Sequence, residues 1–136
     1  MNKLKGILLT QGMHGMISQV EGLAKALDID FTHHTVELNN FWKMIPPKFT
    51  PISQMVYKKV NQSDFDMIIS CGRKSVIPSI HLKNSLKKKI ISIHIQDPKV
   101  NFNNFDFIVA PEHDSIKGLN VINTKGAIHY LSLIHI

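Results

Sequence analysis

Cysteine, tryptophan and arginine are nearly absent from this chain. Its 136 residues include one cysteine, Cys71, one tryptophan, Trp42, and one arginine, Arg73, among 16 lysine and arginine side chains. A single cysteine excludes an internal disulfide and fits a reducing compartment. Proteins that read nucleic-acid sequence depend on arginine for bidentate contacts, so we expect no specific nucleic-acid partner.

Long hydrophobic runs are also missing. No stretch approaches the roughly 18 apolar residues of a membrane span. The apolar run after the first lysines, Ile7 to Leu9, is too short for a signal peptide. We therefore expect a cytoplasmic protein, with peripheral contact to the inner membrane surface as an open alternative. The net charge of +6 favours an anionic small molecule or an acidic membrane surface as its partner.

Short apolar runs alternate with segments of helical spacing along the chain. This alternation predicts one α/β domain with a doubly wound, Rossmann-like parallel sheet. We expect the strand order 2-1-3-4-5, with a further short strand at the edge. The strands are expected at residues 5–10, 31–38, 65–70, 90–95, 105–110 and 120–124, and the helices at 16–27, 52–61 and 75–86.

The segment 65–78 carries the main functional signal. A buried strand is expected to end at a glycine turn, Gly72, and Ser75 is expected to cap the helix that follows. Arg73 and Lys74 would add two positive charges to the N–H groups at the start of that helix. This arrangement predicts binding of a phosphate or another anion. The alternative is an ordinary strand-to-helix turn with two solvated cations.

A second glycine turn follows the first strand. Its pattern, Thr10-x-Gly12-x-x-Gly15, lacks the first glycine of the dinucleotide fingerprint. In the expected strand order, the first and third strands flank the switch point, so the two glycine turns would share one crevice. Five polar residues that follow later strands would line its rim: Gln96, Asp97, Glu112, His113 and Asp114. Asp97 also has a structural interpretation, as a turn residue before a proline.

The sequence favours neither a metal centre nor a bound cofactor. His33 and His34 are adjacent, and a strand would point them to opposite faces. A nicotinamide-dependent epimerase or dehydrogenase is disfavoured by the incomplete glycine pattern. Such an enzyme would also be expected to carry a Tyr-x-x-x-Lys pair, but Tyr57 and Tyr130 are not followed by lysine at that spacing.

The segment 39–51 is irregular and rich in proline. It holds Phe41 and Trp42, which would pack on this domain or on a second one. Exposed beside Lys43 and Lys48, the same pair would instead suit a membrane interface.

Several short motifs together resemble the elongated-mitochondria, or mitochondrial-fission, family. The motifs are Thr10-x-Gly12-x-x-Gly15-x-x-x-Gln19-x-x-Gly22-Leu23-Ala24, Cys71-Gly72-Arg73-Lys74-Ser75, Gln96-Asp97-Pro98-Lys99, the run from Phe105 to Asp114, and Thr124-x-Gly126-Ala127-x-His129. The chain departs from the family pattern at Gln11, Met16 and Ser18, where an acidic residue, His and Asn are expected. The resemblance extends to two-domain GT-B glycosyltransferases.

The resemblance implies an organisation and a set of roles. Residues 1–130 would be the acceptor-side N-terminal domain of a two-domain protein whose C-terminal Rossmann-like domain is missing, and 131–136 would be a non-native tail. Arg73 and Lys74 would hold an anionic or lipid-linked acceptor or a phosphate of a nucleotide-sugar co-substrate. Asp97 or the cluster of Glu112, His113 and Asp114 would supply a general base. A half of this kind would be inactive alone.

The family resemblance also allows a role without catalysis. The fold would then serve as a scaffold that recruits a partner at a membrane surface, as the plant members of the family suggest.

Overall fold

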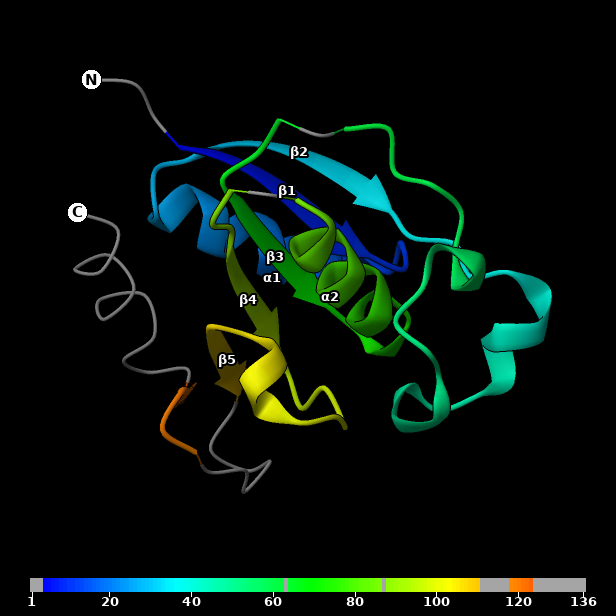
Figure 1. Ribbon diagram of the computed structural model, residues 1–136. Helices are drawn as coiled ribbons and strands as arrows, with labels where there is room; N and C mark the ends of the chain where they lie inside the picture. Colours follow the sequence, from blue (N-terminus) through cyan, green and yellow to red (C-terminus); the bar gives the residue numbers. More distant parts are fainter. Residues whose placement is uncertain (1–3, 63, 87, 111–117, 124–136) are drawn as a thin grey trace.

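The computed structural model describes residues 4–62, 64–86, 88–110 and 118–123. These residues form an α/β fold around a six-stranded, all-parallel sheet with the order β2-β1-β3-β4-β5-β6 (Figure 1). The strands are β1 (Lys5–Thr10), β2 (Asp30–Thr35), β3 (Met67–Cys71), β4 (Ile91–Ile95), β5 (Phe107–Ala110) and β6 (Val121–Asn123). The predicted fold class and strand order are confirmed.

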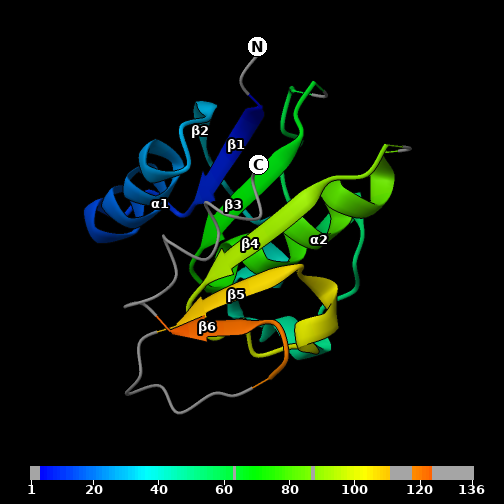
Figure 2. The same ribbon diagram turned by 90° about the vertical axis from the view of Figure 1, so that its left-hand side faces the viewer.

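Two α-helices cover opposite faces of this sheet: α1 (His14–Ala26) and α2 (Val76–Ser85) (Figure 2). Successive residues of β1 divide between the two layers, because strand side chains alternate between faces. Leu8 packs with Val20 of α1, whereas Ile7 packs with Ile80 of α2. All five residues of β3 are buried, which explains its unbroken apolar run. Neither helix, nor any other in the described ranges, is long and apolar enough to cross a membrane.

Short 3₁₀ turns also occur in the described connections between the strands. They are η1 (Asn40–Met44), η2 (Pro47–Phe49), η3 (Gln54–Val56), η4 (Arg73–Ser75) and η5 (Phe102–Asn104). The helix predicted at 52–61 is therefore wrong. The backbone there bonds back to the preceding segment instead: Asn39 N–H donates to the Val56 carbonyl at 2.8 Å and Lys58 N–H to the Glu37 carbonyl at 2.8 Å. These tertiary bonds outweigh the helical spacing of the apolar residues.

The repeated Phe-Asp pair before β3 and β5 has a structural cause. The side chains of Phe65 and Phe105 are buried in the core, 0% and 3% exposed. The carboxylate of Asp66 accepts the Lys5 N–H at 2.9 Å, and that of Asp106 accepts the Ser92 N–H at 2.8 Å. Each aspartate thus satisfies a backbone donor at the beginning of the neighbouring strand. The bond from the Lys5 N–H is also the main reason why the pKa of Asp66 is lowered.

Candidate functional site

The carboxyl ends of β1 and β3 lie side by side, and each is followed by a glycine turn. Leu9 is paired with Ser70 in the parallel ladder. Gly12 and Gly72 have φ values of 92° and 99°, a conformation that side chains other than glycine rarely adopt. The sharp turns that the sequence predicted at these glycines are confirmed.

The two turns are in contact with each other. A Cβ atom on Gly72 would lie 2.8 Å from Met16 Sδ and 3.0 Å from Gln11 Oε1. Gln11 Oε1 also accepts the backbone N–H of Lys74 at 3.3 Å. The loop after β1 and the first turn of α1 therefore pack against the loop after β3. The predicted strand order required this proximity of the two loops.

Ser75 has a different role from the predicted one. Its backbone is already helical, with φ −91° and ψ −7°, and its side chain makes no cap hydrogen bond. An N-cap residue normally has an extended backbone, which lets its side chain reach the helix N–H groups. The buried Ser75 hydroxyl instead donates to the Gly72 carbonyl at 2.8 Å. Ser75 thus closes the turn beneath the candidate site.

The Arg73 side chain reaches toward the segment after β2. Its Nη2 donates to the Lys43 carbonyl at 3.2 Å, and the residue is exposed. Arg73 and Lys74 line a small cavity of about 10 Å³ together with Leu38, Ile45, Pro47, Thr50, Val56 and Ile77. The backbone of this loop therefore contacts Gln11, while its cationic side chains border a hollow on the side of residues 38–56.

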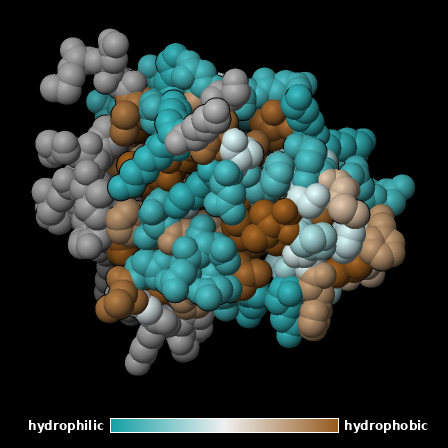
Figure 3. Space-filling view, in the orientation of Figure 1, coloured by the Kyte–Doolittle hydropathy of each residue, from teal (hydrophilic) through white to brown (hydrophobic). Residues whose placement is uncertain are grey.

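A larger groove adjoins that hollow. It has a volume of about 230 Å³ and lies between the segment 47–52, helix α2 and the turn η5. Pro47, Thr50 and Ile77 border both spaces. Figure 3 shows this face of the molecule, where apolar atoms in the centre are surrounded by hydrophilic ones. The two spaces together give a cationic end next to a groove that both apolar and polar side chains line.

Gln96 and Asp97 follow β4 at the same edge of the sheet. Gln96 has a φ of 86° and Lys99 a φ of 60°, so this turn is strained. Asp97 Oδ1 accepts the Lys99 N–H at 2.9 Å, and its Oδ2 lies 3.2 Å from Lys99 Nζ. Asp97 therefore stabilises the turn, in agreement with its structural interpretation. A role as general base would require its carboxylate to leave Lys99.

The other predicted residues divide into two groups. Glu112, His113 and Asp114, like the tail at 131–136, lie outside the described residues. Gly15 lies within the first turn of α1 rather than in the loop, and no atom stands within 4 Å of a Cβ placed on it. Gly15 therefore borders open space and is not required for the turn itself.

Three residues to which the sequence analysis assigned no role help to build the site. Gln11 and Met16 form the contact with Gly72. Thr10 Oγ1 accepts the Gly12 N–H at 3.1 Å and lies 2.7 Å from Nε2 of His33 on β2. Burial lowers the pKa of His33. The available signal was position alone, because Thr10 ends β1 and Gln11 directly follows it, whereas Met16 lies in the first turn of α1.

The described residues contain no group of three or more His, Cys, Asp or Glu side chains that could hold a metal. Cys71, at the end of β3, is fully buried, and burial raises the pKa of its thiol to about 11. A buried thiol with such a pKa stays protonated and is a poor nucleophile.

Comparison with known proteins gives a family. Neither a search of curated proteins nor a search of solved structures found a match. The family model described as "Mitochondrial fission ELM1" matches residues 14–134, which is most of the chain. The match includes α1, both cationic residues of the loop after β3 and the turn at Gln96 and Asp97. The chain therefore belongs to the mitochondrial fission ELM1 family.

Proposed function

We propose that this chain is the acceptor-side half of a GT-B-like sugar transferase, with a nucleotide-sugar as donor and an anionic or lipid-linked acceptor. The observation that carries the proposal is the contact between the two glycine turns, in which Lys74 N–H binds Gln11 Oε1 at 3.3 Å. Ligands of doubly wound folds bind at such a switch point. A second Rossmann-like domain would complete the donor side.

The proposed chemistry needs charge stabilisation more than covalent catalysis. An acceptor hydroxyl forms a bond to the anomeric carbon while the bond to the nucleotide diphosphate breaks. The leaving diphosphate gains negative charge. Arg73, Lys74 and the amino end of α2 would stabilise that charge or the charge of an anionic acceptor. The hydroxyl proton needs a base. Asp97 can accept it only after separation from Lys99, and the segment 112–114 is the other candidate.

A titration tests the proposal. The chain is titrated by calorimetry with nucleotide-sugars and with lipid-phosphate acceptors, and Arg73→Ala is compared with Lys25→Ala. Lys25 lies in the last turn of α1, at the end of that helix away from Gly12, so its variant removes the same charge elsewhere. We expect Arg73→Ala to weaken binding about tenfold, or ~1.4 kcal/mol, and Lys25→Ala to leave it unchanged. No binding of a lipid-phosphate acceptor, or equal binding by both variants, would remove the hypothesis.

A scaffold without catalysis is the second candidate. It is favoured by the large apolar side chains exposed after β2, such as Phe41 and Phe49, which are 70% and 68% exposed. Such a chain would bind a partner at a membrane surface but no nucleotide-sugar. Attachment to membranes that persists in the absence of any nucleotide-sugar binding would favour the scaffold over the transferase.

A further inference from the structure

The segment 39–56, called here the 39–56 loop, forms a closed unit on the fold. Leu38 and Tyr57 form an antiparallel bridge at its base. Just inside the bridge, Asn39 N–H donates to the Val56 carbonyl at 2.8 Å and Asn39 Nδ2 to the Met55 carbonyl at 2.6 Å. The ends of the loop are therefore held together, and the loop extends from the body of the molecule (Figure 1, right).

The inner side of this loop already has its packing partners. Pro47 and Val56 are buried, and Trp42 packs against the core on the α2 face of the sheet. Internal bonds set the shape, among them the bond from Thr50 Oγ1 to the Pro46 carbonyl at 2.9 Å. The loop thus does not need its outer side chains to hold its conformation.

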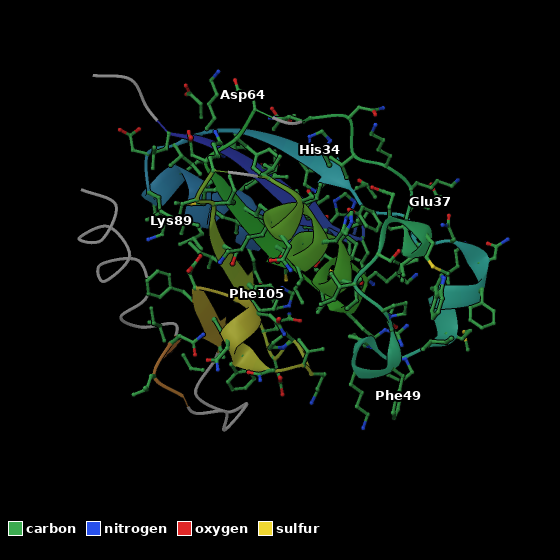
Figure 4. The ribbon with its side chains drawn as sticks, in the orientation of Figure 1. His34, Glu37, Phe49, Asp64, Lys89 and Phe105 are labelled. Carbon is green, nitrogen blue, oxygen red and sulfur yellow. The ribbon has the colours of Figure 1, made fainter. Side chains whose placement is uncertain are left out.

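The outer side is nevertheless strongly apolar. Seven large hydrophobic side chains are exposed in the described ranges, and five of them lie on this loop. They are Phe41 (70% exposed), Met44 (84%), Phe49 (68%), Ile52 (44%) and Met55 (61%). Figure 4 shows Phe49 at the outer end of the loop, directed away from the sheet. Exposed apolar groups gathered in this way mark an interaction surface rather than ordinary scatter.

The charge of the same segment selects the type of partner. The 39–56 loop contains two lysines, Lys43 and Lys48, and neither aspartate nor glutamate. Lys58 and Lys59 follow the loop, and Lys58 Nζ pairs with the Glu37 carboxylate at 3.0 Å. Lys48 Nζ lies 5.0 Å from the centre of the Phe49 ring, so cationic and apolar groups are intermixed. An anionic bilayer offers both matching environments, acyl chains for the apolar groups and headgroups for the lysines. A protein partner would need an apolar surface with acidic residues at matching positions.

We propose that the outer side of the 39–56 loop inserts into the interface of an anionic lipid bilayer. Phe41, Met44 and Phe49 enter the boundary between headgroups and acyl chains, and the lysines contact the headgroups. The Arg73 guanidinium binds the Lys43 carbonyl, so this orientation places the cationic hollow close to the membrane surface. If the proposed transferase function holds, its acceptor is a lipid-linked phosphate that approaches Arg73 and Lys74 from the bilayer through the adjoining groove, because the hollow itself, at about 10 Å³, has room only for a water molecule.

Vesicle sedimentation at physiological salt tests this proposal without any nucleotide-sugar. The chain is mixed with vesicles of phosphatidylcholine alone, or with added phosphatidylglycerol. We expect it to pellet with the anionic vesicles only. Trp42, the one tryptophan of the chain, packs on the inner side but its ring lies 4.7 Å from that of Phe41, centre to centre, so its emission should change when Phe41 enters the bilayer. The vesicle result is independent of the nucleotide-sugar titration, so the two proposals fail separately.

Matched variants locate the contact. Phe41→Ser combined with Phe49→Ser should reduce vesicle binding about tenfold or more, whereas Leu119→Ser, which changes a fully exposed apolar residue elsewhere, should not. Lys43→Glu with Lys48→Glu should reduce binding more than Lys25→Glu with Lys89→Glu, although both pairs change the net charge equally. Figure 4 shows Lys89 on the opposite side of the molecule from Phe49. Circular dichroism checks that each variant is folded.

Three results would overturn the proposal. The first is absence of the folded chain from the anionic pellet. The second is an equal loss of binding in the loop variants and their controls, which would indicate nonspecific attraction of a basic protein. The third is a dimer in solution that the Phe49→Ser change dissociates, together with no vesicle binding, which would identify a second copy as the occupant.

Discussion

The guanidinium of Arg73 donates a hydrogen bond to the backbone carbonyl of Lys43 across 3.2 Å. This bond joins the loop after β3, where we propose that an anion binds, to the 39–56 loop, where we propose that a membrane binds. An anion that takes up the guanidinium would compete with the Lys43 carbonyl. The two proposed surfaces are therefore structurally connected, although each is tested on its own.

Replacement of Gly72 by alanine should destabilise the fold. The residue has a φ of 99°, and its new Cβ would lie 2.8 Å from Met16 Sδ. We expect the free energy of unfolding in urea to fall by about 2 kcal/mol or more, mainly from backbone strain, because the flexible Met16 side chain can move away from the new Cβ. Gly15→Ala is the control, because the space around its Cβ is open. That variant should be unchanged or up to about 0.5 kcal/mol more stable. Similar losses in both variants would contradict the assignment of the turn to Gly72.

Asp106→Asn should weaken the junction between β4 and β5. One oxygen of this carboxylate, Oδ2, accepts the Ser92 N–H at 2.8 Å and lies 2.7 Å from Lys83 Nζ. Loss of the charge should cost about 1.5–3 kcal/mol of unfolding free energy, because the half-buried lysine loses its charged partner. Asp30→Asn, on the exposed start of β2, should stay within about 0.5 kcal/mol of the parent chain. An equal effect at both positions would mean that the carboxylate of Asp106 has no special role.

His94 should make the fold sensitive to acid. It is buried, its Nδ1 lies 2.8 Å from Ser70 Oγ, and burial lowers its pKa from 6.5 to about 3. Between these pH values His94 is therefore protonated in the unfolded chain but neutral in the folded chain. His94 should lower the free energy of unfolding by up to about 1.4 kcal/mol for each pH unit as the pH falls from 6.5 toward 3.

The variant His94→Asn separates this effect from other titrating groups. Asparagine can still bond to Ser70 but does not titrate. The parent chain should be more stable than the variant at neutral pH, because the ring fills the core beside Phe105. The difference should shrink as the pH falls below 6.5, since only the parent loses stability through His94. A difference that stays constant from neutral pH to pH 4 would contradict a neutral, buried histidine.

The Cys71 thiol should be almost unreactive in the folded chain. It is fully buried, and burial raises its pKa to about 11, so very little thiolate forms near neutral pH. Reaction with a thiol reagent should be slow in buffer and become fast on denaturation. Fast modification of the native chain would show that the end of β3 opens to solvent. Cys71 would then be a candidate nucleophile.

The sheet could be predicted from the sequence because its central strands, β1, β3 and β4, are buried on both faces. Runs such as Ile7 to Leu9 leave no other place for the side chains, so strand existence and order follow from alternation and connection rules. The connection from β2 to β3 could not be predicted. Its apolar residues recur at helical spacing, but bonds from Asn39 and Lys58 to the opposite side of the loop fix a different backbone.

The candidate site was predictable in part. Gly12 and Gly72 were predictable because positive φ is nearly restricted to glycine. The direction of the Arg73 side chain was not, since it depends on where the 39–56 loop passes. The roles of Ser75 and Asp97 depend on local geometry as well. Each side chain bonds to the backbone of its own turn, Ser75 Oγ to the Gly72 carbonyl at 2.8 Å and Asp97 Oδ1 to the Lys99 N–H at 2.9 Å. Neither bond belongs to the role that the motif suggested.

Amide chemical-shift mapping by NMR tests the central claim most directly, that the turns after β1 and β3 form one anion site. The chain is titrated with inorganic pyrophosphate at physiological salt. We predict that saturable shifts concentrate on the amides of Gly12, Gly72 and Lys74, and that Arg73→Ala weakens them. Shifts spread over lysines across the surface, or saturable shifts at another place with none at these glycines, would contradict the account.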